Sequence, residues 1–167
     1  MSKILKSFGM AALLVALLAG TGMAGVTTTV TGNVVNSATI NVLETSVAFS
    51  NFAMGENPKE VTDFLEVTTN YNIVLQAAET GATTNDGKMA TAGEAATLTN
   101  ALKVGVGKAA VSLGTGTLPS DPVTVSNTIT APKTADKMTG NFAQDIVPGD
   151  TVATGYTATI TFTAATP

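Results

Sequence analysis

The chain ends on a run of alternating residue types, TVATGYTATITFTAATP. Alternation with a period of two is typical of a β-strand with one buried face, and β-branched threonine suits the exposed face. The pattern therefore predicts a long final strand. Its buried face is predicted to consist of Val152, Thr154, Tyr156, Ala158, Ile160 and Phe162, and its exposed face to carry threonines such as Thr159 and Thr161.

Shorter stretches with strand character fill much of the remaining chain: residues 25–35, 37–52, 62–78, 100–114 and 122–131. Asn85-Asp86-Gly87 predicts a hairpin-type turn, and Pro148-Gly149-Asp150 predicts the turn that precedes the final strand. The polar stretch 81–99 is expected to be a loop, with one helical turn in its alanine-rich end. About seven or eight short strands divided by turns predict an all-β antiparallel sandwich.

The first 24 residues have the pattern of a secretory signal peptide. Two lysines precede an apolar run (residues 8–19), and the small residues Gly22 and Ala24 predict cleavage before Gly25. A membrane anchor is the alternative, but the apolar run is short for a bilayer span. A type IV prepilin leader fits less well, because the stem would be short and has no early glutamate. We therefore expect a secreted chain without a membrane span after cleavage.

The composition excludes several kinds of chemistry. The chain has no histidine, cysteine, arginine or tryptophan, and it has 30 threonines among 167 residues. The usual zinc, copper, haem and iron–sulfur sites therefore lack ligands, and Ser–His or Cys–His nucleophiles are impossible. Without the leader lysines, six lysines face twelve acidic residues, a net charge of −6 that disfavours nucleic-acid binding.

No constellation of acidic residues points to an active site. Glu44, Glu56, Glu60, Asp63 and Glu66 are close in sequence, but a solvated surface explains them better than paired catalytic carboxylates. An enzyme is therefore the least supported class, and no cofactor is expected.

Two other kinds of site stay open. Glu79, Asp86 and Glu94 could offer oxygens to calcium, although the loop lacks an EF-hand pattern. A lysine–asparagine isopeptide crosslink is conceivable in a secreted β domain, but solvent exposure is the default for Lys103 and Lys108.

The order of features resembles the major pilins of the chaperone–usher type, in the spore-coat-protein-U-like and colonisation-factor branches. The resemblance rests on an early alternating strand, GVTTTVTGNVVNSATINV, a central VTTNYNIVLQAAETG, and a polar loop with its following strand, NDGKMATAGEAATL and LTNALKVGV. It ends on the turn and two-faced strand PGDTVATGYTATITFTA. It covers most of the mature chain as a pattern of strands and turns.

The resemblance implies an incomplete immunoglobulin-like sandwich that is completed by the N-terminal segment of another subunit. Residues 25–36 would be the donor strand, and residues 37–167 the sandwich domain. Its implied donor face is Val26, Thr28, Val30 and Val34, and its implied acceptor groove is lined by Ile40, Val42, Tyr156, Ile160 and Phe162. The chain would then be a subunit of a homopolymeric pilus or fimbrium in adhesion or biofilm, assembled with a periplasmic chaperone and usher.

Two departures and two alternatives accompany this interpretation. Many spore-coat-U-like members have a disulfide, which this chain cannot form, and four residues, AATP, follow Thr163. Camelysin-like biofilm fibre subunits and archaeal bundling pilins also exchange donor strands, without an usher. The alternative function is a monomeric secreted or cell-wall-associated binding module of the WxL-like kind. Residues 25–36 could also fold back as a strand of their own domain.

Overall fold

The computed structural model describes residues 34–49, 51–80, 86–113 and 122–167, which belong to one compact unit, Val34–Pro167. The expected signal peptide and the donor-face residues Val26, Thr28 and Val30 lie outside the described residues. Within the unit, strands account for nearly all regular structure.

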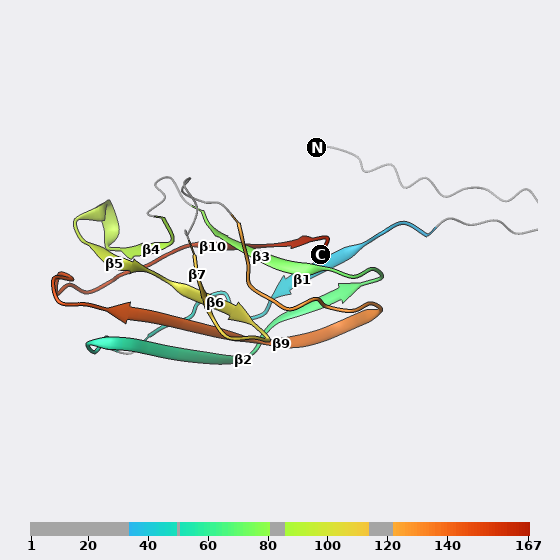
Figure 1. Ribbon diagram of the computed structural model, residues 1–167, viewed down its shortest axis with the longest axis horizontal. Helices are drawn as coiled ribbons and strands as arrows, with labels where there is room; N and C mark the ends of the chain where they lie inside the picture. Colours follow the sequence, from blue (N-terminus) through green and yellow to red (C-terminus); the bar gives the residue numbers. More distant parts are fainter. Residues whose placement is uncertain (1–33, 50, 81–85, 114–121) are drawn as a thin grey trace, which may run out of the picture. The chain divides into compact units, whose positions relative to one another are not determined.

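One sheet has five strands and is built around a long antiparallel pair. β2 (Gly55–Thr69) and β9 (Lys133–Ile146) run side by side over most of their length (Figure 1). β1 (Ala38–Val42) pairs with the second half of β2, whereas β6 (Lys103–Val106) pairs with β9 and β7 (Val111–Ser112) with β6. The strand order is therefore β1-β2-β9-β6-β7.

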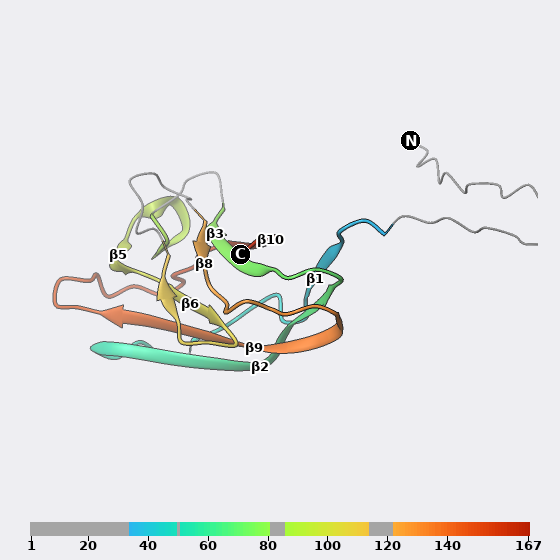
Figure 2. The ribbon, with the colours of Figure 1, turned by 45° about the vertical axis from the view of Figure 1, so that its right-hand side comes forward.

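The second sheet has three strands in the order β10-β3-β8, and a hairpin lies beside it. β10 (Ile160–Ala165) and β8 (Val123–Thr124) each pair antiparallel with β3 (Val74–Glu79). β4 (Lys88–Ala90) and β5 (Thr97–Ala101) form the hairpin, joined by a 3-10 turn at Ala92–Glu94 where the alanine-rich stretch predicts a helical turn. Figure 2 shows β3 and β8 opposite the β2–β9 pair.

The hydrophobic core lies between the two sheets. Leu65 and Val67 of β2 and Leu75 of β3 are completely buried in one cluster, together with Val104 and Val106 of β6. On one side the sheets are linked, because Val106 N donates to Val125 O at 2.7 Å. The expected all-β antiparallel sandwich is confirmed.

The final strand is shorter than the alternation predicts. β10 begins at Ile160, and the preceding residues include Gly155 at φ +77°, a backbone conformation that does not continue a strand. Val152 is fully exposed and Thr154 is also exposed, so the predicted burial of both residues is wrong. From Tyr156 onward the two faces are as predicted. One face is half-buried and consists of Tyr156, Ala158, Ile160, Phe162 and Ala164, and the intervening threonines are exposed.

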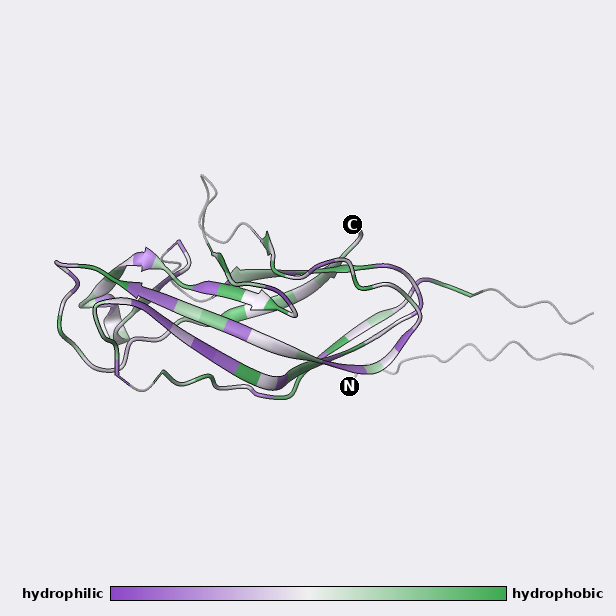
Figure 3. Ribbon diagram, turned by 60° about the horizontal axis from the view of Figure 1, so that its bottom comes forward, coloured by the Kyte–Doolittle hydropathy of each residue, from purple (hydrophilic) through white to green (hydrophobic). Residues whose placement is uncertain are grey.

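The sequence patterns miss β9 altogether. Its sequence KTADKMTGNFAQDI mixes charged, small and apolar residues, and Ala135 adopts φ +50° within the strand. Figure 3 shows the resulting mixture of hydrophilic and hydrophobic bands along β2 and β9. The pairing with β2, rather than any alternation of its own, holds this segment extended.

The predicted turn at Pro148 is present, whereas of the predicted Asn85-Asp86-Gly87 turn only Asp86 and Gly87 lie within the described residues. This second turn does not close a hairpin, because β3 pairs with β8 and β10 and β4 pairs with β5. Asp86 and Gly87 have φ of +54° and +76°, the left-handed pair that a type I′ turn requires. In the other turn, Asp150 N donates to Val147 O at 3.1 Å and Gly149 has φ +110°, as in a type II turn with Pro148 at its second position.

The two phenylalanines that contact Phe64 should differ in their contribution to stability. Phe142 is 5% exposed and Phe162 is only half-buried, although both rings lie edge-on to Phe64. We expect Phe142→Ala to cost about 3–5 kcal/mol and Phe162→Ala about half as much in the unassembled chain. The exposed-face control Thr159→Ala should cost less than about 1 kcal/mol. Urea denaturation followed by circular dichroism measures all three, and equal losses on both faces would contradict the half-buried strand.

Asp150 should make stability depend on acidity. Burial alone raises the pKa of its carboxyl group, but hydrogen bonds from Thr99 and Val147 outweigh this and hold the pKa below its ordinary value of 3.8. The carboxylate therefore stabilises the fold above pH 4, and this contribution is lost as pH falls through the lowered pKa. Asp150→Ala should cost about 1–3 kcal/mol at pH 7 and progressively less below pH 4, in urea titrations of both proteins. A difference that is independent of pH would contradict the assignment.

Candidate functional site: an open groove between two edge strands

β1 and β10 are edge strands of different sheets on the same side of the sandwich. Each has one neighbour in its own sheet among the described residues, and the two strands approach each other with some Cα atoms within 8 Å (Figure 1). An edge strand leaves a row of backbone N–H and C=O groups without a partner strand. This side of the molecule therefore has two such rows.

The hydrogen-bond register identifies the unpaired groups. Asn70 N donates to Ser37 O at 3.2 Å and Leu43 N to Phe64 O at 2.9 Å, so alternate residues of β1 bond to β2. The backbone groups of Ala38, Ile40 and Val42 consequently point away from β2.

β10 has the same arrangement. Thr80 N donates to Thr159 O at 2.8 Å, so the backbone groups of Ile160, Phe162 and Ala164 point away from β3. The side chains of these residues, like those of the outward-bonding residues of β1, are half-buried against the core. Both edges therefore have free backbone groups next to inward apolar side chains.

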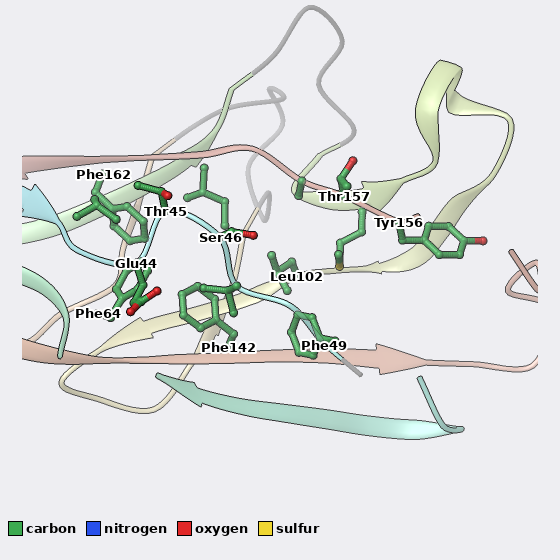
Figure 4. A pocket seen from close by; sticks show the side chains of 15 residues that line it. Glu44, Thr45, Ser46, Phe49, Phe64, Leu102, Phe142, Tyr156, Thr157 and Phe162 are labelled. Atoms are coloured by element: carbon green, nitrogen blue, oxygen red, sulfur yellow. The ribbon is translucent and has the colours of Figure 1, made fainter. Parts of the chain in front are cut away.

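A groove of about 250 Å³ begins where β1 ends and runs along the segment that leads into β10. Its floor is made by Phe64, Met89, Leu102 and Phe142 (Figure 4). One wall follows the chain after β1 and the other is the half-buried face of the last segment. The wall residues are Val42, Glu44, Thr45, Ser46, Val47 and Phe49 on one side, and Tyr156, Thr157, Ala158, Ile160 and Phe162 on the other.

Aromatic packing fixes the floor. The Phe64 ring lies edge-on to Phe142 at 5.1 Å and to Phe162 at 5.4 Å between ring centroids, so it joins β2, β9 and β10. Gly140 of β9 makes room for this cluster, because a Cβ there would come within 2.7 Å of Phe64 Cγ and 2.8 Å of Phe142 Cε2. The floor is therefore rigid and apolar.

The residues implied as an acceptor groove are largely brought together. Val42, Tyr156, Ile160 and Phe162 line the groove, whereas Ile40 packs against the core outside its lining. The floor residues were not identified as a group from sequence, because they come from β2, β4, β9 and the residue between β5 and β6. The sequence does indicate that Val47 and Phe49 face the core. They are two residues apart, as on one face of a strand, although the alternation that begins with Ile40 and Val42 shifts by one residue before them.

The chain enters the domain at the far end of β1. Asn70 holds this entry, since its Nδ2 donates to Val35 O at 2.8 Å and its Oδ1 accepts from Ser37 N at 2.7 Å. Val34 and Val35 are 90% and 74% exposed and belong to no strand. The described part of the donor candidate thus packs little against its own domain.

Charge is scarce in the groove, where Glu44 is the only lining residue with a carboxylate or an amine. Among the described residues, three lysines form ion pairs on the five-stranded sheet: Lys103 with Glu56, Lys133 with Asp136 and Lys137 with Asp63. Lys103 Nζ is 2.6 Å from Glu56 Oε1, and this hydrogen bond, against a smaller opposing effect of burial, raises the pKa of Lys103 above 10.5. A protonated, ion-paired amine is a poor nucleophile, so Lys103 does not suit isopeptide formation. Lys108 Nζ lies 3.4 Å from Thr124 O.

The calcium hypothesis gains no geometric support. Glu79 is buried, and its Oε2 accepts a hydrogen bond from Gly87 N at 2.8 Å. This carboxylate therefore stabilises the turn before β4. Within residues 34–49, 51–80, 86–113 and 122–167, no three acidic side chains gather closely enough to hold a metal ion. The same residues include no helix long and apolar enough to span a membrane.

Comparisons with protein-family models, curated proteins and solved structures found no match. The groove and its surroundings are therefore the basis for any functional inference.

A bulky substitution inside the groove should reduce ligand binding by the groove without destabilising the fold. Ala158 points into the groove and Thr159 points to solvent on the other face. Ala158→Phe should leave the free energy of unfolding unchanged or raise it by up to about 1 kcal/mol, because the added ring occupies open space. It should also reduce the fluorescence of a bound apolar dye such as ANS, and Thr159→Phe serves as the matched control. Equal dye binding by both variants would show that the groove is not the apolar surface accessible to ligands.

Proposed function

We propose that this protein is a secreted structural subunit of an extracellular fibre, in which residues 25–36 of one copy enter the groove of the next. The observation that carries the proposal is an open groove with an apolar floor, which begins where the edge strand β1 ends and reaches the edge strand β10. An extended strand is the ligand that fits such a site, since its backbone pairs with an edge and its alternate side chains fill the groove. Adhesion and biofilm formation are the roles that such a fibre would serve.

Residues 25–36 match the chemistry of the groove. The segment GVTTTVTGNVVN has no charged side chain. Its predicted donor face carries Val26, Thr28, Val30 and Val34, so this face is largely apolar and compatible with the phenylalanine floor. It precedes β1 directly, and the exposed Val34 and Val35 lie at its end. A copy of the same chain therefore supplies a suitable strand without any other partner.

The energetics favour a durable rather than a strongly downhill junction. Strand addition contributes about 0.5–1.5 kcal/mol per backbone hydrogen bond and about 1.5–3 kcal/mol per buried apolar side chain. Ordering each residue of the donor costs about 1–2 kcal/mol, which offsets much of this gain. The lifetime of the fibre then depends mainly on slow opening of the completed sandwich.

The second candidate function is a monomeric binding module of the WxL-like kind at the cell wall. The observation in its favour is that much of the core is already complete, with Leu65, Ile73 and Leu75 fully buried without a donor. Size-exclusion chromatography distinguishes the two functions, because a binding module elutes as a monomer and a fibre subunit gives ladders or filaments. A chaperone and usher could guide assembly, and an export experiment without them tests that requirement.

Deleting residues 25–36 from the mature chain should abolish filaments without unfolding the domain. The described core lies between residues 38 and 164, so the deletion removes none of it. Circular dichroism should therefore remain that of a β-protein, while electron microscopy shows no filaments. Filaments that persist in the deletion variant would overturn the donor-strand mechanism.

A pair of substitutions tests the face of the donor. Val30→Asp places a charge on the predicted apolar face and should prevent polymerisation, because burying a carboxylate without a partner is costly. Thr29→Asp adds the same charge on the opposite face and should leave filaments intact. A chain that stays monomeric with or without these substitutions, and that does not bind a synthetic peptide of residues 25–36, would instead indicate that the segment folds back on its own domain.

A further inference from the structure

Residues 45–49, here called the strap, lie along the groove without being anchored by hydrogen bonds. Leu43 N and Glu44 N both donate to Phe64 O, at 2.9 Å and 3.2 Å, and these are the last bonds that tie this chain to β2. Beyond them, neither backbone nor side chain of the strap forms a hydrogen bond with any residue that the structure describes. Segments with few backbone hydrogen bonds open at low free-energy cost.

Two apolar side chains hold the strap in place. Val47 and Phe49 are half-buried against the core, and the Phe49 ring lies 5.3 Å from the Phe52 ring between centroids. Thr45 and Ser46 are exposed and line the groove on the strap side (Figure 4). The strap therefore covers part of the apolar floor with a small number of non-directional contacts.

The position of the strap follows from a bulge in β2, because the pairing of β1 with β2 ends at this bulge and the chain after β1 then diverges from β2. The register between β2 and β9 shifts between Val61 and Leu65, and Asp63 in this stretch has φ +52°. β1 follows β2 only as far as this bulge. Gly55–Val61 of β2 consequently pair with β9 alone among the described residues, while the chain after β1 crosses toward the groove.

We propose that the strap covers part of the groove floor in the free subunit and is displaced when a donor strand enters. This inference rests on the proposed function, and it adds a regulatory step to assembly. An incoming extended segment competes for the same apolar floor and brings backbone hydrogen bonds that the strap lacks. The strap thereby shields the apolar floor before assembly and slows the entry of the donor.

Association of a synthetic peptide with the sequence of residues 25–36 tests the proposal, using the compact unit without its own donor (residues 37–167) as acceptor. Phe49→Ala removes an anchor of the strap and should raise the association rate by about tenfold. The comparison variant is Phe52→Ala, which removes one contact of the Phe49 ring but does not line the groove and leaves Val47 and Phe49 packed against the core. This variant should change the rate by less than about twofold. Stopped-flow fluorescence of a labelled peptide gives all three rates.

Slower or weaker binding by Phe49→Ala than by Phe52→Ala would show that Phe49 is a fixed wall of the occupied groove, and would overturn the strap. Absence of binding by the unsubstituted acceptor and by both variants would overturn the proposed function and the strap with it. Binding by the Phe49→Ala variant alone would support both the proposed function and the strap. It would show that the strap prevents peptide binding in the unsubstituted acceptor instead of only slowing it.

A second readout follows the strap itself. The chain contains no cysteine, so Ser46→Cys can carry a single nitroxide label, and Thr159→Cys places the same label on the outer face as a control. If the strap leaves, the mobility of the label at position 46 should rise when peptide binds, while the label at position 159 changes little. A fall in mobility at position 46 would contradict displacement.

Discussion

The antiparallel pairing of β2 with β9 is the interaction on which the rest of the fold depends. It extends from Gly55–Ile146 at one end to Thr69–Lys133 at the other, and it supports β1 on one side and β6 on the other. It also brings Phe64 and Phe142 together as the floor of the groove. The bulge in this pairing decides where β1 ends, and so decides that one side of the sandwich remains open.

The two sides of the sandwich are closed to different degrees. On one side, Val106 and Val125 link the sheets by a backbone hydrogen bond, and both side chains are fully buried. On the other, the inward residues of β1 and β10 are only half-buried, because no strand of the described part of the chain pairs with either of these edges on its open side. The exposure of Phe162 is thus a local consequence of missing neighbours rather than of a weak pattern in its sequence.

Much of the fold could be predicted from local sequence patterns, whereas the groove could be predicted only in part. Alternation identified β3, the faces of β10 and the buried positions of β6, and glycine and proline placed both turns. β9 could not be found in this way, because positive φ at Ala135 and the small Gly140 interrupt its alternation for reasons of tertiary packing. Phe64, Met89, Leu102 and Phe142 converge only through topology, so no spacing along the chain could predict the floor they form.

An apolar groove floor beside free strand edges exposes a protein to indiscriminate association. This chain has no cysteine with which to brace the opening by a disulfide, and its few charges lie mostly outside the groove. Under the proposed displacement, a strap held by Val47 and Phe49 would shield the floor through non-directional apolar contacts and would yield to a strand that adds hydrogen bonds. Selectivity would then come from the backbone pairing that only an extended, alternating segment can supply, and the slow step of assembly would also be the step that excludes poorly matched partners.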